Sequence, residues 1–155
     1  DPASDLPAVV LALGGSMVAR GPGGERVIAA GDFFTSFMES ALAPDEVLTE
    51  VRVPKVPDAG WSFQKFNRRA QDWAIVGVAA VVGNGSTGVG LVNMGSTPLF
   101  AAGVVEALRA GAGAAEAAER ADEGTEPQSD VNATPEYRRH LARVLVRRAL
   151  ESAGG

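Results

Sequence analysis

The sequence predicts an α+β fold, in which the end of an α/β subdomain is followed by a three-stranded antiparallel sheet packed with a three-helix bundle. Three observations lead to this prediction. Apolar segments of strand length follow one another between residues 61 and 94, and helical segments follow them. Residues 55–60 carry two prolines and a glycine at the point where the charge balance changes. We therefore expect two domains, residues 1–56 and residues 57–155.

Composition narrows the classes of function. Of the 155 residues, 46% are hydrophobic, and no apolar run reaches the roughly 18 residues of a membrane span. The net charge of −5 arises in residues 1–54, which hold three arginines and eight acidic residues. Such a segment does not favour nucleic acid, whose binding needs clustered positive charge. The chain has no cysteine, so it holds neither a disulfide nor a thiolate-bound iron–sulfur cluster.

The first domain begins with a helix and a hairpin. Residues 5–13 predict a short apolar helix with Asp5 as its N-cap and the following glycine pair as its end. Residues 17–20 and 26–28 flank a glycine-rich loop and predict a β-hairpin.

A helical turn and a strand complete the first domain. The turn is expected from Asp32 through Phe37. Residues 45–53 alternate apolar and polar side chains with period 2, which predicts a half-buried strand that Pro54 ends.

The second domain begins with three predicted strands, residues 61–68, 73–82 and 89–94. Alternation in the first of them separates two sets of side chains on opposite faces. One face carries Trp61, Phe63 and Lys65, and the other carries Ser62, Gln64 and Phe66.

Three helices are predicted after the strands. Thr97-Pro98 gives a start signal for a helix to about residue 110, and an alanine-rich helix is expected over residues 113–122. Thr134-Pro135 repeats the start signal for a last helix that ends near residue 151.

The last helix carries an apolar stripe and many arginines. The stripe consists of Tyr137, Leu141, Val144 and Leu145. We expect the arginines on the outer face of the helix, which therefore offers either a solvated surface paired with nearby acids or a docking surface for a partner subunit. They are Arg138, Arg139, Arg143, Arg147 and Arg148.

Residues 83–88 match the G-x-G-x-x-G pattern of dinucleotide-binding sites. That pattern requires a helix directly after it, because the helix N-terminus binds the pyrophosphate. The residues that follow here predict a strand, so we interpret the match as a hairpin loop. The single histidine, His140, excludes a multi-histidine metal site, and we assign no metal ligand and no acid–base catalyst.

Residues 65–73 are the strongest candidate for a functional site. A charged segment with Lys65 and two arginines runs directly into an apolar strand, and Asp72 and Trp73 stand at the junction. One interpretation is an ordinary ion pair and a core tryptophan at a strand end. The other is the edge of a pocket for a planar cofactor such as flavin, whose chemistry needs an aromatic cover and charge near the ring.

Five segments resemble the FAD-binding medium subunit of molybdenum hydroxylases, a class that includes aerobic carbon monoxide dehydrogenase and xanthine dehydrogenase. The segments are DPASDLP (1–7), GDFF (31–34), LAPDEVL (42–48), FNRRAQDWAIVGVA (66–79) and YRRHLA (137–142). Their order and spacing together make the resemblance specific. It implies that residues 1–56 form the end of an FAD-binding domain and that residues 57–155 form the C-terminal α+β domain.

The resemblance implies four cofactor-binding residues. Asp5 would contact FAD, Leu48 would pack near the isoalloxazine ring, and Trp73 would cover the flavin as an aromatic does in the carbon monoxide dehydrogenase-like branch. Lys65 falls near a lysine that approaches the flavin in the xanthine dehydrogenase branch. A slip of one residue would put Gln64 in that place instead, on the opposite face of the strand.

The resemblance also implies partners and a route for electrons. Electrons would pass from [2Fe-2S] clusters on a small subunit, through FAD, to an external acceptor, after substrate oxidation at the molybdenum cofactor of a large subunit. We expect a cytoplasmic protein, with the inner face of the membrane as an alternative place. The other functional hypothesis is a non-catalytic docking module without cofactor.

The sequence departs from the family in one respect. The glycine-rich loops A-G-G-x-S and T-x-G-G, which hold the pyrophosphate upstream in the family, do not occur here. The chain therefore resembles the C-terminal portion of such a subunit. We expect this portion by itself to bind FAD weakly or not at all and to be inactive.

Overall fold

The computed structural model describes residues 4–83 and 85–154. Its first elements are α1 (Asp5–Ala12), β1 (Ser16–Gly21), β2 (Gly24–Ala29), α2 (Ala30–Phe33), β3 (Phe34–Ser36), β4 (Glu39–Ser40) and β5 (Val47–Arg52). The later elements are β6 (Gly60–Phe66), β7 (Val76–Val82), β8 (Gly88–Val92), β9 (Leu99–Phe100), α3 (Ala102–Arg109), α4 (Ala114–Ala118) and α5 (Pro135–Gly154). The predicted α+β fold with antiparallel sheets is confirmed.

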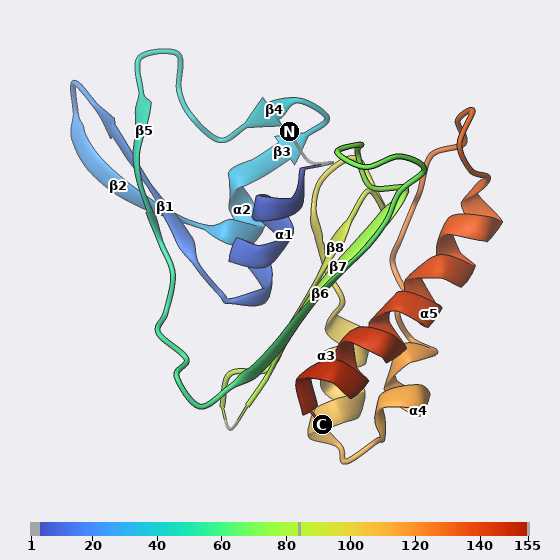
Figure 1. The fold of residues 1–155 in the computed structure, drawn as a ribbon. Coiled ribbons are helices and arrows are strands. Elements are labelled where there is room, and N and C mark those ends of the chain that lie inside the picture. Colours follow the sequence, from blue (N-terminus) through green and yellow to red (C-terminus); the bar gives the residue numbers. More distant parts are fainter. Residues whose placement is uncertain (1–3, 84, 155) are drawn as a thin grey trace.

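The architecture is layered around one central sheet. Strands β6, β7, β8 and β9 lie in that order, with α1 on one face and α3, α4 and α5 on the other (Figure 1). A second antiparallel sheet, in the order β2-β1-β5, packs against α1 and α2. Helix α1 thus lies between the two sheets, and it joins the first part of the chain to the second.

The predicted hairpin and helix end are confirmed. Strands β1 and β2 pair from Ser16–Ala29 to Gly21–Gly24, and Gly24 has a φ of +111°, a conformation that glycine tolerates. Helix α1 ends at Ala12 with Leu13 as its C-cap, and Gly14 follows with a φ of +65°. Its N-cap is Ser4, so Asp5 is the first residue of the helix and not the predicted N-cap.

Strand β5 forms as predicted, but the prediction that it is half-buried is wrong. All six of its residues are exposed. Leu48 and Val51 oppose the buried Ala19 and Met17, and a bulge at Thr49 puts them on the same face although they are three residues apart. Helix α2 contacts β1 and β2 on this face. Strand β5 lies at the edge of the sheet and is left uncovered.

The central sheet contains one strand more than predicted. Leu99 pairs with Leu91, and the Ala101 N–H donates to the Val89 carbonyl at 2.9 Å, so residues 99–100 extend the sheet as β9. The start signal at Thr97-Pro98 therefore precedes a strand, and α3 begins only at Ala102. Pairing with β8 outweighs the local helix preference.

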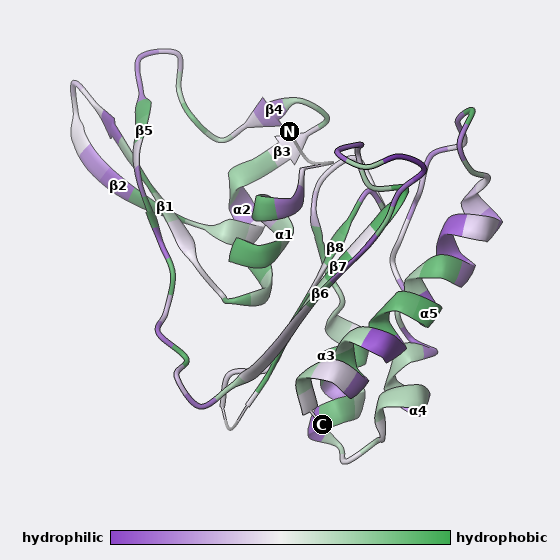
Figure 2. Ribbon diagram, viewed as in Figure 1, coloured by the Kyte–Doolittle hydropathy of each residue, from purple (hydrophilic) through white to green (hydrophobic). Residues whose placement is uncertain are grey.

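The helical layer differs from the prediction in two details. The alanine-rich helix α4 is shorter than expected, because residues 119–124 form turns. In α5, Leu141 and Leu145 are buried as expected, but Tyr137 is 43% exposed. Arg138, which we placed on the outer face, is the largest fully buried side chain, with 1% exposure. Figure 2 shows apolar residues of α5 on the side that faces the sheet.

The two faces of the central sheet are packed in different ways. Large aliphatic side chains of β7 and β8 interdigitate with α3 and α5 on one face. On the other face, α1 lies directly on glycine backbone, since a Cβ at Gly90 would stand 2.2 Å from the Ala8 carbonyl oxygen. A Cβ at Gly88 would likewise stand 2.0 Å from the Ala12 carbonyl oxygen. Only glycine permits so close an approach.

Candidate functional site

An ion pair joins the first and second parts of the chain at the candidate site. Lys65 Nζ, near the end of β6, lies 2.9 Å from Oδ2 of Asp5, the first residue of α1. The two side chains are 27% and 38% exposed, respectively. The carboxylate lies at the helix N-terminus, where the helix dipole favours a negative charge. An ammonium group is thereby held at one position on the α1 side of the sheet.

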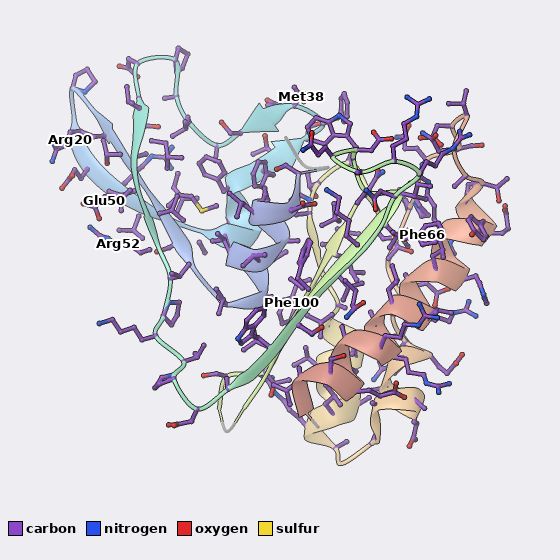
Figure 3. All side chains as sticks on the ribbon, in the orientation of Figure 1. Arg20, Met38, Glu50, Arg52, Phe66 and Phe100 are labelled. Carbon is purple, nitrogen blue, oxygen red and sulfur yellow. The ribbon has the colours of Figure 1, made fainter. Side chains whose placement is uncertain are left out.

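The register of β6 separates Lys65 from Gln64. Lys65 opposes Gly77 and lies on the face covered by α1, whereas Gln64 opposes Val78, which belongs to the core under the helices. Gln64 Nε2 donates to Ser62 Oγ at 3.0 Å, within its own face. The next residue on that face, Phe66, packs edge-on against Tyr137 with 6.5 Å between ring centroids, and Figure 3 shows it beside α5.

Trp73 lies in the loop between β6 and β7 (residues 67–75), which we call the tryptophan loop. The Ile75 N–H donates to the Phe66 carbonyl at 2.8 Å and closes the loop at its base. Gln71 turns the chain with a φ of +61°, and Asp72 Oδ1 accepts a hydrogen bond from the Trp73 N–H at 2.9 Å. The Trp73 side chain is 59% exposed and so presents its ring to the outside. It is not the core tryptophan of our first interpretation.

A polar cavity of about 250 Å³ adjoins Trp73. Residues from the tryptophan loop, the segment after β8, residues 130–132 and α5 line it. Among the lining residues are Arg68, Asp72, Trp73, Asn93, Asp130 and Arg138. The cavity brings together chain segments that are more than 60 positions apart in the sequence.

Leu48 lies in a different sheet from Lys65. It belongs to β5 and is 38% exposed on the face that α1 and α2 partly cover. Of the four predicted cofactor-binding residues, the described structure brings Asp5 and Lys65 together in an ion pair. Trp73 and Leu48 are both exposed, on separate parts of the molecule.

Several acidic groups outside the candidate pair have lowered pKa values, among them Glu46, Asp122 and Asp130. Hydrogen bonds from the Arg26 guanidinium at 2.7 and 2.8 Å, and then from the Ala43 N–H, lower the pKa of Glu46 to about 2. The bidentate hydrogen bond from Arg143 lowers the pKa of Asp122. Burial alone would raise the pKa of Asp130, but the N–H groups of residues 132–133 and the Arg138 guanidinium outweigh it and lower the pKa.

The sequence prediction missed the role of Arg138. Its guanidinium bonds the carbonyl of Ile75, the carbonyl of Gln128 at 3.0 Å and Asp130 Oδ2 at 2.7 Å. One signal was present, because Arg138 falls on the helical stripe of Leu141, Ala142 and Leu145. We assigned it to the outer face on its charge alone.

The described residues contain no group of three or more His, Cys, Asp or Glu side chains that could hold a metal ion. Within the same residues, none of the helices has the length and apolar character to cross a membrane.

Comparisons with known proteins show the family to which this chain belongs. The family of CO dehydrogenase flavoprotein C-terminal domains matches residues 61–153, and that of FAD binding domains in molybdopterin dehydrogenases matches residues 1–56. The fold and the flavoprotein domains thus define an FAD-binding subunit of the molybdenum hydroxylase class, and the resemblance seen in the sequence is confirmed. The chain belongs to the family of carbon monoxide dehydrogenase-type medium subunits.

Individual relatives have the same fold. The medium chain of carbon monoxide dehydrogenase from Afipia carboxidovorans is 34% identical over 99% of this chain and 57% of its own length. Reconstituted CO dehydrogenase from Oligotropha carboxidovorans superposes with a TM-score of 0.90 at 33% identity, over 99% of this chain and 57% of that one. Quinoline 2-oxidoreductase from Pseudomonas putida 86 superposes with a TM-score of 0.85 at 29% identity, over 99% and 56%. The chain thus spans a little over half the length of these relatives.

Proposed function

We propose that this chain supplies one wall of the flavin site in the electron-transfer subunit of a molybdenum hydroxylase. FAD, when bound, would take electrons from [2Fe-2S] clusters on a small subunit and deliver them to an external acceptor, while a large subunit holds the molybdenum cofactor. The observation that carries the proposal is the Lys65–Asp5 pair, a cation fixed on the α1 face two residues before the loop that carries the exposed Trp73.

The charge of Lys65 supports a flavin at this place. An ammonium group beside the ring stabilises the negative charge that a flavin gains on reduction. Lys65 would provide that charge, and Asp5 would hold it in place through the 2.9 Å contact. The exposed indole of Trp73 would cover the ring and exclude water, and Leu48 would offer an apolar contact on the β5 side. None of these residues acts as an acid or base on the substrate.

We place the boundary between the two domains at residues 56 and 57. The prolines and the glycine of this segment support it, as do the two family matches, which end at residue 56 and begin at residue 61. Because α1 packs on β8 across this boundary, each domain contributes one member of the Lys65–Asp5 pair.

The phosphate-binding half of the flavin site would come from a segment other than these 155 residues. The glycine-rich loops of the family do not occur in the 155 residues, so we expect the chain alone to retain little FAD and to have no activity. Produced together with an upstream segment that carries these loops, it would bind FAD. We expect the assembled protein in the cytoplasm or at the inner face of the membrane.

A non-catalytic docking module is the second candidate function. The observation that favours it is an apolar hollow of about 310 Å³ between α1 and β6, with Trp61 at 74% exposure on its rim. The arginines of α5 support it less, because Arg143 is paired with Asp122 and Arg147 with Glu151. This module would hold a partner protein and no flavin.

Absorbance spectroscopy separates the two functions. Co-expression with the glycine-rich segment should give a yellow protein with flavin bands and about one FAD per chain. A colourless complex that also takes up no added FAD would contradict the electron-transfer function and favour the module.

Substitution of the two lysines tests the site itself. Lys65→Met should lower the reduction potential of the bound flavin, whereas Lys55→Met should not, because Lys55 is exposed and is the chain's only other lysine. Equal potentials in the two variants would remove Lys65 from the site.

A further inference from the structure

The buried guanidinium of Arg138 holds the C-terminal end of the tryptophan loop. Arg138 Nη1 donates to the Ile75 carbonyl, two residues after Trp73, and the Arg138 side chain is only 2% exposed. Asn93 Nδ2 donates to the Ala74 carbonyl at 2.8 Å, so the carbonyls of two successive residues are fixed by side chains from α5 and from the segment after β8. The backbone that follows Trp73 therefore has little freedom.

A series of hydrogen bonds connects Arg138 with the N-terminal end of the loop. Arg138 Nη2 pairs with Asp130 Oδ2 at 2.7 Å, while Asp130 Oδ1 accepts from the N–H groups of Asn132 and Ala133 at 2.9 and 3.0 Å. Asn132 Oδ1 in turn accepts from Arg68 Nη1 at 3.2 Å. Arg68 is the second residue of the tryptophan loop, so the chain of bonds runs from one end of the loop to the other.

Stability alone does not explain a buried arginine at this place. Burial of a guanidinium carries a desolvation penalty that its hydrogen bonds only offset, and apolar residues often replace buried ion pairs without loss of stability. Its planar fork does, however, fix several acceptors in one geometry, which lysine or an apolar side chain cannot do. What Arg138 specifies here is the position of Ile75 relative to residues 128–130.

We infer that Arg138 is a positioning residue that fixes the tryptophan loop, and with it the orientation in which Trp73 would meet the flavin. The inference rests on the proposed function for the flavin and on the structure alone for the loop. Arg138 itself need not touch the cofactor.

The fluorescence of Trp73 tests the loop directly. The chain has two tryptophans, so Trp61→Phe leaves Trp73 as the sole indole. In this background we expect Arg138→Met to lower the anisotropy of Trp73 and to increase its quenching by acrylamide. The matched control, Arg147→Met on the same helix, removes only an exposed pair with Glu151 and should change neither.

A second variant keeps the test valid if Arg138→Met does not fold. Asn132 is exposed, and Asn132→Ala removes the side-chain hydrogen bond to Arg68 while the N–H group of residue 132 still donates to Asp130. This variant should also lower the anisotropy of Trp73. Arg138→Lys should give an anisotropy between those of Arg138→Met and the unsubstituted Arg138. Unchanged anisotropy in folded Arg138→Met, or in Asn132→Ala if the former does not fold, would overturn the inference.

The holoprotein then tests the functional half. In the assembled subunit with FAD bound, Arg138→Met should reduce the quenching of flavin fluorescence by Trp73 and shift the flavin reduction potential, and Arg147→Met should do neither. If wild type binds no FAD, the proposed function fails, but the fluorescence of Trp73 still shows whether Arg138 fixes the tryptophan loop. If FAD binds and its spectrum and potential are the same in both variants, the positioning role is overturned.

Discussion

The two faces of the central sheet differ in what packs against them. On the α5 face, side chains such as Val76, Leu91 and Val146 interlock in a thick aliphatic core. On the α1 face, Ala8 and Gly90 bring backbone against backbone with hardly any side chain between them. The candidate site lies on this thin face, with Lys65 at its edge. The thick face holds the largest cluster of buried aliphatic side chains, and the thin face brings Lys65 to Asp5 of α1.

Removal of a large side chain from the thick face should have the largest effect on stability. Leu91 is 1% exposed, and Leu91→Ala should lower the free energy of unfolding by about 2–5 kcal/mol, because it leaves a cavity that the core cannot fill. Urea denaturation followed by circular dichroism measures this. The control is Leu6→Ala in α1, where Leu6 is 73% exposed and a loss of about 0.5 kcal/mol or less is expected. Equal losses would contradict the assignment of the core.

Addition of a methyl group to the thin face should have the next largest effect. In Gly90→Ala the new Cβ would stand 2.2 Å from the Ala8 carbonyl oxygen, so α1 must move away from β8 at a cost of about 1–3 kcal/mol. The same movement should separate Asp5 from Lys65 and weaken flavin retention in the holoprotein. Gly23→Ala is the control, because nothing lies within 4 Å of its Cβ. If Gly90→Ala were as stable as wild type, α1 would not rest on the sheet backbone.

Acid should weaken the protein through its paired carboxylates. Glu46, Asp122 and Asp130 have lowered pKa values in the fold, so their contribution is complete above the ordinary carboxylate range near pH 4.5 and is lost as the pH falls toward 2. Urea midpoints at pH 7, 4 and 2.5 should decrease in that order.

Removal of the arginine that holds Glu46 should flatten the low-pH part of this profile. In Arg26→Met the carboxylate loses its hydrogen bonds at 2.7 and 2.8 Å, so its folded pKa moves back toward the unfolded value. Arg20→Met, in the exposed pair with Glu25 of the same sheet, is the control. Figure 3 shows Arg20 on the outer side of this sheet together with Glu50 and Arg52. An unaltered profile in Arg26→Met would contradict the assignment of Glu46.

The smallest effect is expected at the ion pair itself. Because Lys65 and Asp5 are 27% and 38% exposed, Lys65→Met should cost at most about 1 kcal/mol of stability. Its effect on bound flavin should be clearer, a decrease in potential of roughly 20–40 mV, since loss of a nearby positive charge disfavours reduction. Asp5→Asn should raise the potential, because it removes the opposite charge. Shifts of the same sign in both variants would contradict an electrostatic role.

The sequence predicted those parts of the fold that depend on local periodicity. The hairpin of β1 and β2, the three longer strands of the central sheet and helix α5 follow from alternation, glycine turns and start signals. Short elements that depend on distant partners could not be predicted. Strand β9 exists because Leu99 meets Leu91, and the exposure of β5 depends on where the helices end.

The candidate site divides in the same way. Lys65 and Trp73 were found because charge, an aromatic residue and a strand boundary meet in one segment. The ion pair of Lys65 with Asp5, 60 positions away, needed the docking of α1, which no local pattern encodes. Arg138 was misplaced because its charge argued for solvent, whereas its position on the apolar stripe of α5 argued correctly for the interior.

The docking of α1 on β8 has a consequence for synthesis of the protein. At about 5–20 residues per second on a ribosome, Gly90 is made roughly 4–16 s after Ala8. During that interval α1 can pack on β1, β2 and α2, but the face that meets β8 stays without its partner until the later strand is made. Asp5 can pair with Lys65 only after β6 has been made and α1 has docked on the central sheet, so this ion pair would form late in folding.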